Sequence, residues 1–111
     1  MDKRLAMCVL VSLSALVPGV AQATEAQKTN CVVTRYQYDE NRLALWCSGD
    51  GTIYYAFTTS QGTGCPVQTA ETMKIWVSMA QTSLLSGKSL DFWSNTSCTT
   101  LKIMSWGTSL H

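Results

Sequence analysis

CPVQTAETMKIWVSMAQTSLLSGKSLDFW, residues 65–93, is the segment of the chain with the clearest helical periodicity. Its apolar residues recur at spacings of three and four, which is typical of a helix that buries one side. The stripe consists of Met73, Trp76, Val77, Ala80 and Leu84, and it is widened by Ile75, Met79 and Leu85. The sequence therefore predicts one amphipathic helix between two blocks of other structure.

Both ends of this helix carry recognisable signals. Thr69 or Thr72 can cap the first turn through a side-chain oxygen, and Glu71 favours the positive end of the helix dipole. Gly87 suits the position where a helix ends in left-handed backbone geometry. We expect the helix to end there and a strand to follow.

The segment before the helix is predicted to form three strands. Residues 31–38 and 42–47 are rich in β-branched and aromatic residues, as strands usually are. The pair Gly49-Asp50 favours a tight hairpin loop, and this loop leads to a third strand at residues 52–58.

Folding the first two strands about Asp39 places Val33 opposite Leu45 and Cys31 opposite Cys47. Under this register both faces of the sheet are apolar, whereas a sheet with one wet face alternates more cleanly. Either the strands curl into a small barrel with a covered exterior, or one face meets another subunit.

Two further strands are predicted after the helix, at residues 88–93 and 99–106, with a turn at residues 94–97. The resulting order, β-β-β-α-β-β, is that of an OB-fold, a five-stranded Greek-key barrel. The predicted fold class is therefore a small OB-fold-like barrel with one amphipathic helix. An open α+β sheet with the helix packed across it is the alternative.

The beginning of the chain has the three parts of a secretory signal peptide. Basic residues at positions 3 and 4 precede an apolar run at residues 5–17 and the small-x-small sequence Ala21-Gln22-Ala23. The run is shorter than the roughly 20 residues that a membrane-spanning helix needs. We expect a signal peptide at residues 1–23 and one domain at residues 24–111, exported to the periplasm or secreted, without membrane insertion. The polar residues 24–30 are expected to form a loose arm.

Four cysteines remain in the expected mature chain, and an even number in a short exported protein indicates two disulfides. The predicted hairpin brings Cys31 and Cys47 within bonding range, which leaves Cys65 with Cys98. Cys31–Cys98 with Cys47–Cys65 is the main alternative, because sequence alone does not fix connectivity. Zinc is disfavoured, since there is no C-x-x-C pair and the only histidine is His111.

Charge and motifs exclude several classes of function. Residues 24–111 contain six basic and six acidic residues, dispersed along the chain, so no basic stripe for nucleic acid is present. There is no internal histidine for a Ser-His or Cys-His pair, and no glycine-rich phosphate-binding motif. Asp39, Glu40 and Asp50 lie in predicted turns, where acidic residues have backbone roles. We expect no catalysis and no cofactor.

Two segments carry a resemblance to a known group of proteins. WVSMAQTSLLSGKSLDFW, residues 76–93, resembles the helix-Gly-Lys-strand passage of subtilase-cytotoxin and pertussis-like B subunits, the receptor-binding parts of bacterial A–B toxins. LDFWSNTSCTTLKIMSW, residues 90–106, is similar to the last hairpin of the cholera and heat-labile B subunits, where a W-N-N-K stretch helps to hold a sugar. Trp93 and Asn95 keep the W-x-N part, Thr96 replaces the lysine, and Asp91 stands where that family has a cysteine.

The resemblance covers about the last third of the chain. It implies an OB-fold, a host glycan as ligand, a homo-oligomeric ring and a catalytic A subunit as partner. Aromatic faces beside amides and hydroxyls suit sugar rings, and this chain is rich in Trp and Tyr. The predicted glycan-binding residues are Trp93 with Asn95, and Tyr36 beside Arg42.

Two functions are therefore considered. In the first, the protein is a non-catalytic binding module, similar to toxin B subunits, that recognises a host glycan and oligomerises. In the second, it is a periplasmic inhibitor, immunity or scaffold protein that binds another protein through the same aromatic residues. Trp76 is assigned to the core in both.

Overall fold

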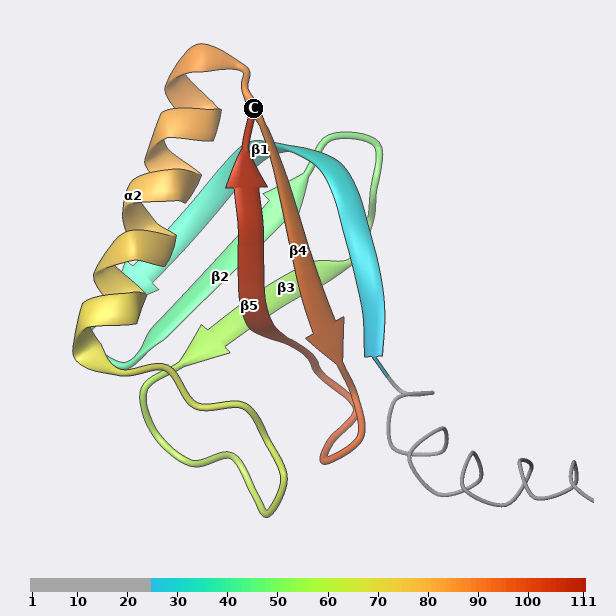
Figure 1. Ribbon diagram of the computed structural model, residues 1–111, viewed down its shortest axis with the longest axis vertical. Coiled ribbons are helices and arrows are strands. Elements are labelled where there is room, and N and C mark those ends of the chain that lie inside the picture. The colour runs from blue at the N-terminus through green and yellow to red at the C-terminus, as the bar shows by residue number, and fades with distance from the viewer. Residues whose placement is uncertain (1–24) are drawn as a thin grey trace, which may run out of the picture.

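The computed structural model describes residues 25–111, and the predicted signal peptide lies outside the described residues. Five strands and one helix follow one another in the order β-β-β-α-β-β (Figure 1). They are β1 (Glu25–Asp39), β2 (Arg42–Cys47), β3 (Ile53–Phe57), α2 (Ala70–Ser86), β4 (Ser89–Asn95) and β5 (Lys102–Leu110).

The sheet closes into a barrel in the order β1-β2-β3-β5-β4. Helix α2 follows β3 and precedes β4 in the sequence, and it packs against the barrel. This confirms the predicted five-stranded barrel and is consistent with an OB-fold. The alternative of an open sheet is wrong. No helix within residues 25–111 combines the length and the hydropathy needed to cross a membrane.

Strand β1 is longer than predicted, because residues 25–30 are part of it and not a loose arm. This first part pairs with β4, from Glu25 opposite Asn95 to Lys28 opposite Phe92, and the second part pairs with β2. The two parts meet at an irregularity between Lys28 and Cys31, where Asn30 adopts a positive φ of 55°. The polar N-terminal residues are thus ordered by a strand that is distant in the sequence.

The predicted register of the first hairpin is wrong. Leu45 pairs with Tyr36, because the hairpin turns at Glu40 and Asn41 with Asp39 opposite Arg42. A bulge between Val33 and Arg35 then shifts the ladder by one residue, so that Val33 pairs with Cys47. The Cys31–Cys47 disulfide forms nevertheless, with its Cα atoms 5.0 Å apart.

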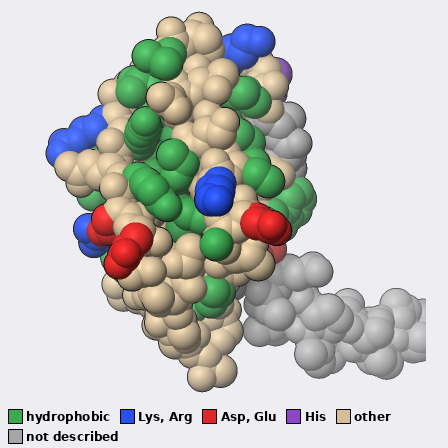
Figure 2. Space-filling model, turned by 90° about the vertical axis from the view of Figure 1, so that its left-hand side faces the viewer, with side chains coloured by type: hydrophobic (Ala, Val, Ile, Leu, Met, Phe, Trp, Pro, Cys, Tyr) green, Lys and Arg blue, Asp and Glu red, His purple; other side chains and the backbone are tan. Residues whose placement is uncertain are grey.

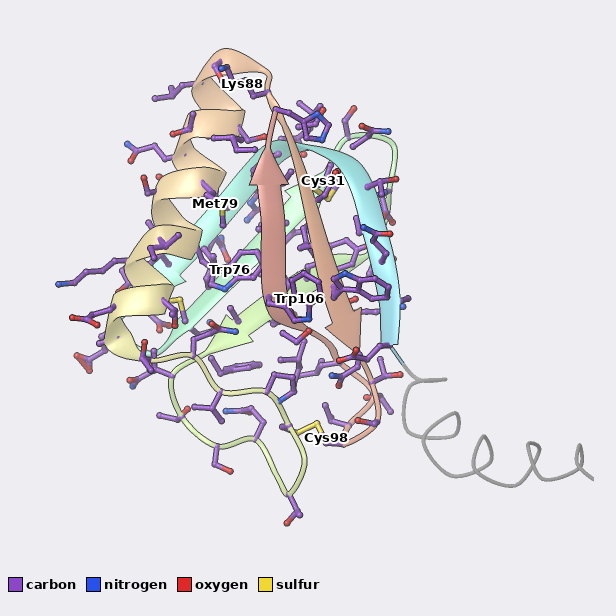
Figure 3. The ribbon with its side chains drawn as sticks, in the orientation of Figure 1. Cys31, Trp76, Met79, Lys88, Cys98 and Trp106 are labelled. Atoms are coloured by element: carbon purple, nitrogen blue, oxygen red, sulfur yellow. A yellow bond between two sulfur atoms is a disulfide. The ribbon has the colours of Figure 1, made fainter. Side chains whose placement is uncertain are left out.

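The second predicted disulfide, Cys65–Cys98, is also present, so the alternative connectivity is wrong. It ties the loop before α2 to the loop between β4 and β5 (Figure 3). Two disulfides are typical of proteins in oxidising compartments outside the cytoplasm.

Helix α2 begins and ends where the sequence predicts. The Thr69 side-chain oxygen accepts a hydrogen bond from the Thr72 N–H at 3.0 Å, and Gly87 takes the left-handed conformation with φ 79°. The buried residues on the inner face are Met73, Trp76, Ala80 and Ser83. Leu84, predicted to face inward, is 42% exposed, since Ser83 takes the inward position.

The core lies between α2 and the inner faces of the strands. Phe92 is its centre, because the rings of Tyr54 and Trp76 both meet it edge-on, at centroid distances of 5.0 and 5.9 Å. The core of this small domain is therefore aromatic and is shared by helix and barrel.

Strands β4 and β5 both differ from their predicted bounds. β4 continues through Ser94 and Asn95, which were expected in a turn, and β5 runs on to Leu110. The barrel closes between β3 and β5 through a short parallel contact, with Tyr54 opposite Lys102 and Tyr55 opposite Ile103.

Candidate functional site

Trp93 and Trp106 form a stacked pair on the outside of the barrel. They lie opposite each other in the β4–β5 ladder, and their rings are 5.7 Å apart at an interplanar angle of 28°. Phe92 points into the core, so its neighbour Trp93 points outward. Trp106 is 49% exposed. We call these two residues the tryptophan shelf.

The backbone beside the shelf is held close to α2 by a glycine. A Cβ atom at Gly107 would lie 3.3 Å from the Met79 methyl and 3.3 Å from the Trp76 ring. Figure 3 shows Trp76 between α2 and β5. A larger residue at Gly107 would therefore push β5 away from the helix.

Polar groups flank the shelf. Gln27 of β1 lies opposite Trp93 on the side away from Trp106, and its side chain is exposed. Asp91, two residues before Trp93 in β4, accepts a hydrogen bond from the Asn30 N–H at 2.9 Å and contacts the His111 Nε2 at 3.0 Å. The tryptophan shelf therefore has the Gln27 amide on the β1 side. Along β4, the Asp91 carboxylate lies two residues before Trp93 and contacts the His111 imidazole.

The four predicted glycan-binding residues are distributed over different parts of the barrel. Asn95 is buried, and its amide nitrogen donates to the Glu25 carboxylate at 3.4 Å. Tyr36 packs against the core, and Arg42 lies in the β1–β2 hairpin, 3.7 Å from the Asp39 carboxylate. Among the contacts in residues 25–111, none joins Trp93 to Tyr36 or to Arg42.

In the structure Trp93 stacks against Trp106. The sequence analysis did not include Trp106 among the predicted glycan-binding residues. The ladder between β4 and β5 has two register irregularities, one of them between Trp93 and Ser94. Each shift changes which residues lie opposite each other in the two strands. The pairing of Trp93 with Trp106 could therefore not be predicted from the hairpin sequence.

A groove lies between α2 and β5, next to the shelf. It measures about 260 Å³ and is lined by Gln68, Thr72, Ile75, Trp76, Met79, Ser105, Trp106 and Gly107. None of these residues is charged. Figure 2 views the molecule from the side of α2 and shows hydrophobic side chains gathered across this face. Trp106 belongs to both the shelf and the groove.

Gln68 is a buried polar residue in the lining of the groove. Its side chain is 8% exposed, and its amide nitrogen donates to the carbonyls of Met104 and Ser105 at 3.2 and 3.1 Å. The start of the free edge of β5 is therefore covered by a side-chain amide in place of a strand.

The strongest electrostatic feature lies away from the shelf, at Asp50. Its carboxylate accepts hydrogen bonds from the Tyr54 hydroxyl at 2.7 Å and the Thr52 N–H at 2.9 Å, and it pairs with Lys28 at 3.1 Å. These bonds, led by that of Tyr54, hold the pKa of Asp50 well below its usual range. Burial and the neighbouring carboxylate raise the pKa of Tyr54 to about 12. Through Lys28, the contacts of Asp50 connect β1 with the β2–β3 turn.

Within residues 25–111, no three His, Cys, Asp or Glu side chains lie together in a way that could hold a metal ion. The four cysteines of this part are all in disulfides.

No protein-family model matches this chain, and no curated protein matches it at a significant level.

Proposed function

We propose that this protein is an exported, non-catalytic binding module whose tryptophan shelf stacks against a sugar ring of a glycan. The observation that supports this most directly is the stacked Trp93–Trp106 pair, with Trp106 half exposed on the outer surface. An indole face offers a flat apolar surface to the C–H face of a sugar, at little conformational cost.

The groups around the shelf complement such a ligand. The Gln27 amide can both donate and accept hydrogen bonds, and the Asp91 carboxylate accepts them. Sugar hydroxyls need both kinds of partner when water is displaced. The shelf thus combines one apolar surface with polar groups, as binding sites for small polar ligands usually do.

A glycan array tests this proposal. The wild-type protein should bind a subset of glycans, and Trp106→Ala and Trp93→Ala should each weaken that binding by about tenfold or more, as loss of a central aromatic contact does. Trp46→Ala is the matched control, because Trp46 is also partly exposed but stacks under the Arg35 guanidinium, 4.5 Å from the ring centroid. Binding of no glycan by the wild type, or equal binding by Trp106→Ala, would contradict the proposal.

We further propose that several copies assemble into a ring with equivalent sites, as the resemblance to toxin B subunits implies. The apolar side chains exposed on α2, with Leu85 78% exposed, support association. The mass of the protein in solution tests this part separately, since a strict monomer contradicts the ring and leaves the shelf untouched.

A second candidate function, binding of another protein, is favoured by the groove between α2 and β5. Its lining is uncharged and includes Ile75, 57% exposed, next to the half-exposed Trp106. Exposed apolar patches of this kind are commonly the sites where a protein binds a partner.

A further inference from the structure

Trp106 belongs to the tryptophan shelf and to the groove at the same time. On one side of β5 lies β4 with Trp93, whose ring stacks against Trp106. The groove lies on the other side of β5, between this strand and α2 (Figure 1). Trp93 therefore covers one face of the Trp106 ring, and the groove is lined by the side of the ring that faces α2. A ligand held at Trp106 has the groove directly beside it.

The amide and hydroxyl donors in the lining of the groove already have partners. The Gln68 amide nitrogen donates to two backbone carbonyls, at 3.2 and 3.1 Å. The Thr72 hydroxyl donates to the Thr69 carbonyl at 3.1 Å, and the Ser105 hydroxyl donates to the Trp93 carbonyl at 3.3 Å. The groove therefore has few donors left for sugar hydroxyls, whereas its apolar surface is open to a ligand.

The floor of the groove is closed. Trp76 and Met79 extend from α2 toward β5 (Figure 3), and a Cβ atom at Gly107 would lie 3.3 Å from each of them. Nothing therefore enters between β5 and α2 at this point. β5 contributes only a three-residue stretch to the lining. An occupant of the groove lies above this floor, beside Ile75 and Trp106, and it is compact.

The surface and the size of the groove fit a compact apolar group. Ile75 is 57% exposed and Trp106 is 49% exposed, and no charged residue lines the groove. An enclosed apolar cavity of about 150 Å³ holds one benzene molecule, whereas this open groove measures about 260 Å³. A group of roughly six to eight carbon atoms therefore has room on this surface.

We propose that the ligand of the tryptophan shelf is a glycoconjugate whose sugar carries a compact apolar group, and that the groove binds this group. The sugar lies on the shelf, and the apolar group lies between Trp106 and Ile75 with Met79 beneath it. Trp106 contacts both parts of the ligand. Removal of apolar surface from water favours this arrangement. The inference rests on the proposed glycan binding and adds the class of glycan.

Isothermal titration calorimetry with paired glycosides tests the inference. The probes are methyl and hexyl β-glycosides of glucose, galactose and N-acetylglucosamine, so that the two members of a pair differ only in the length of the apolar group. For at least one sugar, the hexyl glycoside should bind about tenfold or more tightly than the methyl glycoside, because the added CH₂ groups leave water when they enter the groove.

Ile75→Glu should remove this advantage, since it places a charge beside the apolar group. The affinity for the hexyl glycoside should fall to within about twofold of that for the methyl glycoside, which itself should change by less than about twofold. Leu85→Glu is the matched control: it adds the same charge to an exposed leucine of the same helix outside the groove, and the hexyl advantage should remain. Trp106→Ala should weaken the binding of both glycosides.

Nuclear Overhauser effects locate the two parts of the bound hexyl glycoside. We expect contacts from the hexyl chain to the methyl groups of Ile75 and Met79. The protons of the sugar ring should contact the indole protons of Trp93 and Trp106.

Equal binding of the methyl and hexyl glycosides, with both weakened by Trp106→Ala, overturns the inference and leaves the proposed shelf in place. A hexyl advantage that Ile75→Glu does not change also overturns it, because the chain then binds elsewhere. The same holds if 1-hexanol binds as tightly as the hexyl glycoside, since the groove then takes an apolar partner that needs no sugar. Absence of binding by every methyl and hexyl glycoside overturns the inference as well, and the glycan array then decides separately on the proposed function.

Discussion

Ser83 lies on the inner face of α2, where a polar side chain needs partners. Its hydroxyl accepts a hydrogen bond from the Val33 N–H at 2.9 Å and donates to the Lys88 carbonyl at 2.6 Å. Val33 borders the bulge of β1, so its N–H is displaced from the regular ladder. One hydroxyl thus joins the helix, the first strand and the chain that leaves the helix.

Replacement of Ser83 by alanine should lower the free energy of unfolding by about 1–3 kcal/mol, because a buried backbone N–H loses its acceptor. Ser86→Ala is the control: that hydroxyl is exposed and bonds only within the last turn region, so its loss should cost less than about 0.5 kcal/mol. Urea denaturation followed by circular dichroism measures both. Equal stability of Ser83→Ala and wild type would show that the bridge is not needed.

Asp50 makes the stability of the protein depend on pH. Its pKa is lower in the folded than in the unfolded state, so its contribution is present above the unfolded pKa, near 4, and is lost as the pH falls. The difference in unfolding free energy between wild type and Asp50→Asn should be largest above about pH 5 and should shrink steadily below about pH 4.

Glu40→Gln controls for removal of a negative charge from an exposed turn and should change the unfolding free energy by less than about 0.5 kcal/mol. A difference between wild type and Asp50→Asn that is the same at pH 3 and pH 7 would contradict the role given to the carboxylate.

At the scale of the elements, α2 could be predicted because its signals are local. The cap at Thr69, the inward stripe from Met73 to Ala80 and the stop at Gly87 depend on residues within a few positions of one another. The predicted stripe fails at Leu84, because Ser83 is drawn inward by partners on other segments. It also fails at Ile75 and Leu85, which are exposed.

The strands show the opposite behaviour. The first residues of β1 become a strand only because β4, more than 60 residues later, provides the pairing edge. The bulge after Val33 and the register shifts near Trp93 are irregularities of strand pairing that the alternation of residues along one strand does not predict. For the same reason Trp93 could be singled out from the sequence, whereas its stacking partner Trp106 could not.

Gly87 offers a test of the end of the helix. Its φ of 79° is costly for any residue with a Cβ atom, so Gly87→Ala should reduce the unfolding free energy by about 1 kcal/mol. Gly51→Ala is the control, because Gly51 lies in the loop between β2 and β3, does not have a positive φ, and a Cβ there would meet nothing within 4 Å. Thermal unfolding measures the loss of stability in both variants. An equal loss in Gly87→Ala and Gly51→Ala would contradict the capping role of Gly87.

At the scale of the whole molecule, the two disulfides differ in their surroundings. Cys31 and Cys47 are 0% and 3% exposed, whereas Cys65 and Cys98 are both partly exposed. A dissolved thiol must reach a sulfur atom before it can exchange with a disulfide. The two bridges should therefore respond differently to reduction.

A low concentration of reductant should open Cys65–Cys98 first and leave Cys31–Cys47 intact. Alkylation of the free thiols followed by peptide mass spectrometry measures the order. Loss of this bridge, which closes a loop of about 33 residues, should lower the unfolding free energy by about 3–4 kcal/mol. Simultaneous reduction of both bridges would show that exposure does not control access.

The order of the cysteines along the chain has a consequence for biogenesis. Within residues 25–111 each cysteine bonds its neighbour in the sequence, 31 with 47 and 65 with 98, so the two closed loops neither overlap nor enclose each other. A chain that enters an oxidising compartment N-terminus first presents each correct pair before the following pair emerges. Reduced, denatured protein can in contrast form three different pairings. We therefore expect export to yield the native bridges without a disulfide isomerase. The ratio of native to mispaired protein should be the same in cells with and without that enzyme, and a lower ratio without it would contradict this expectation.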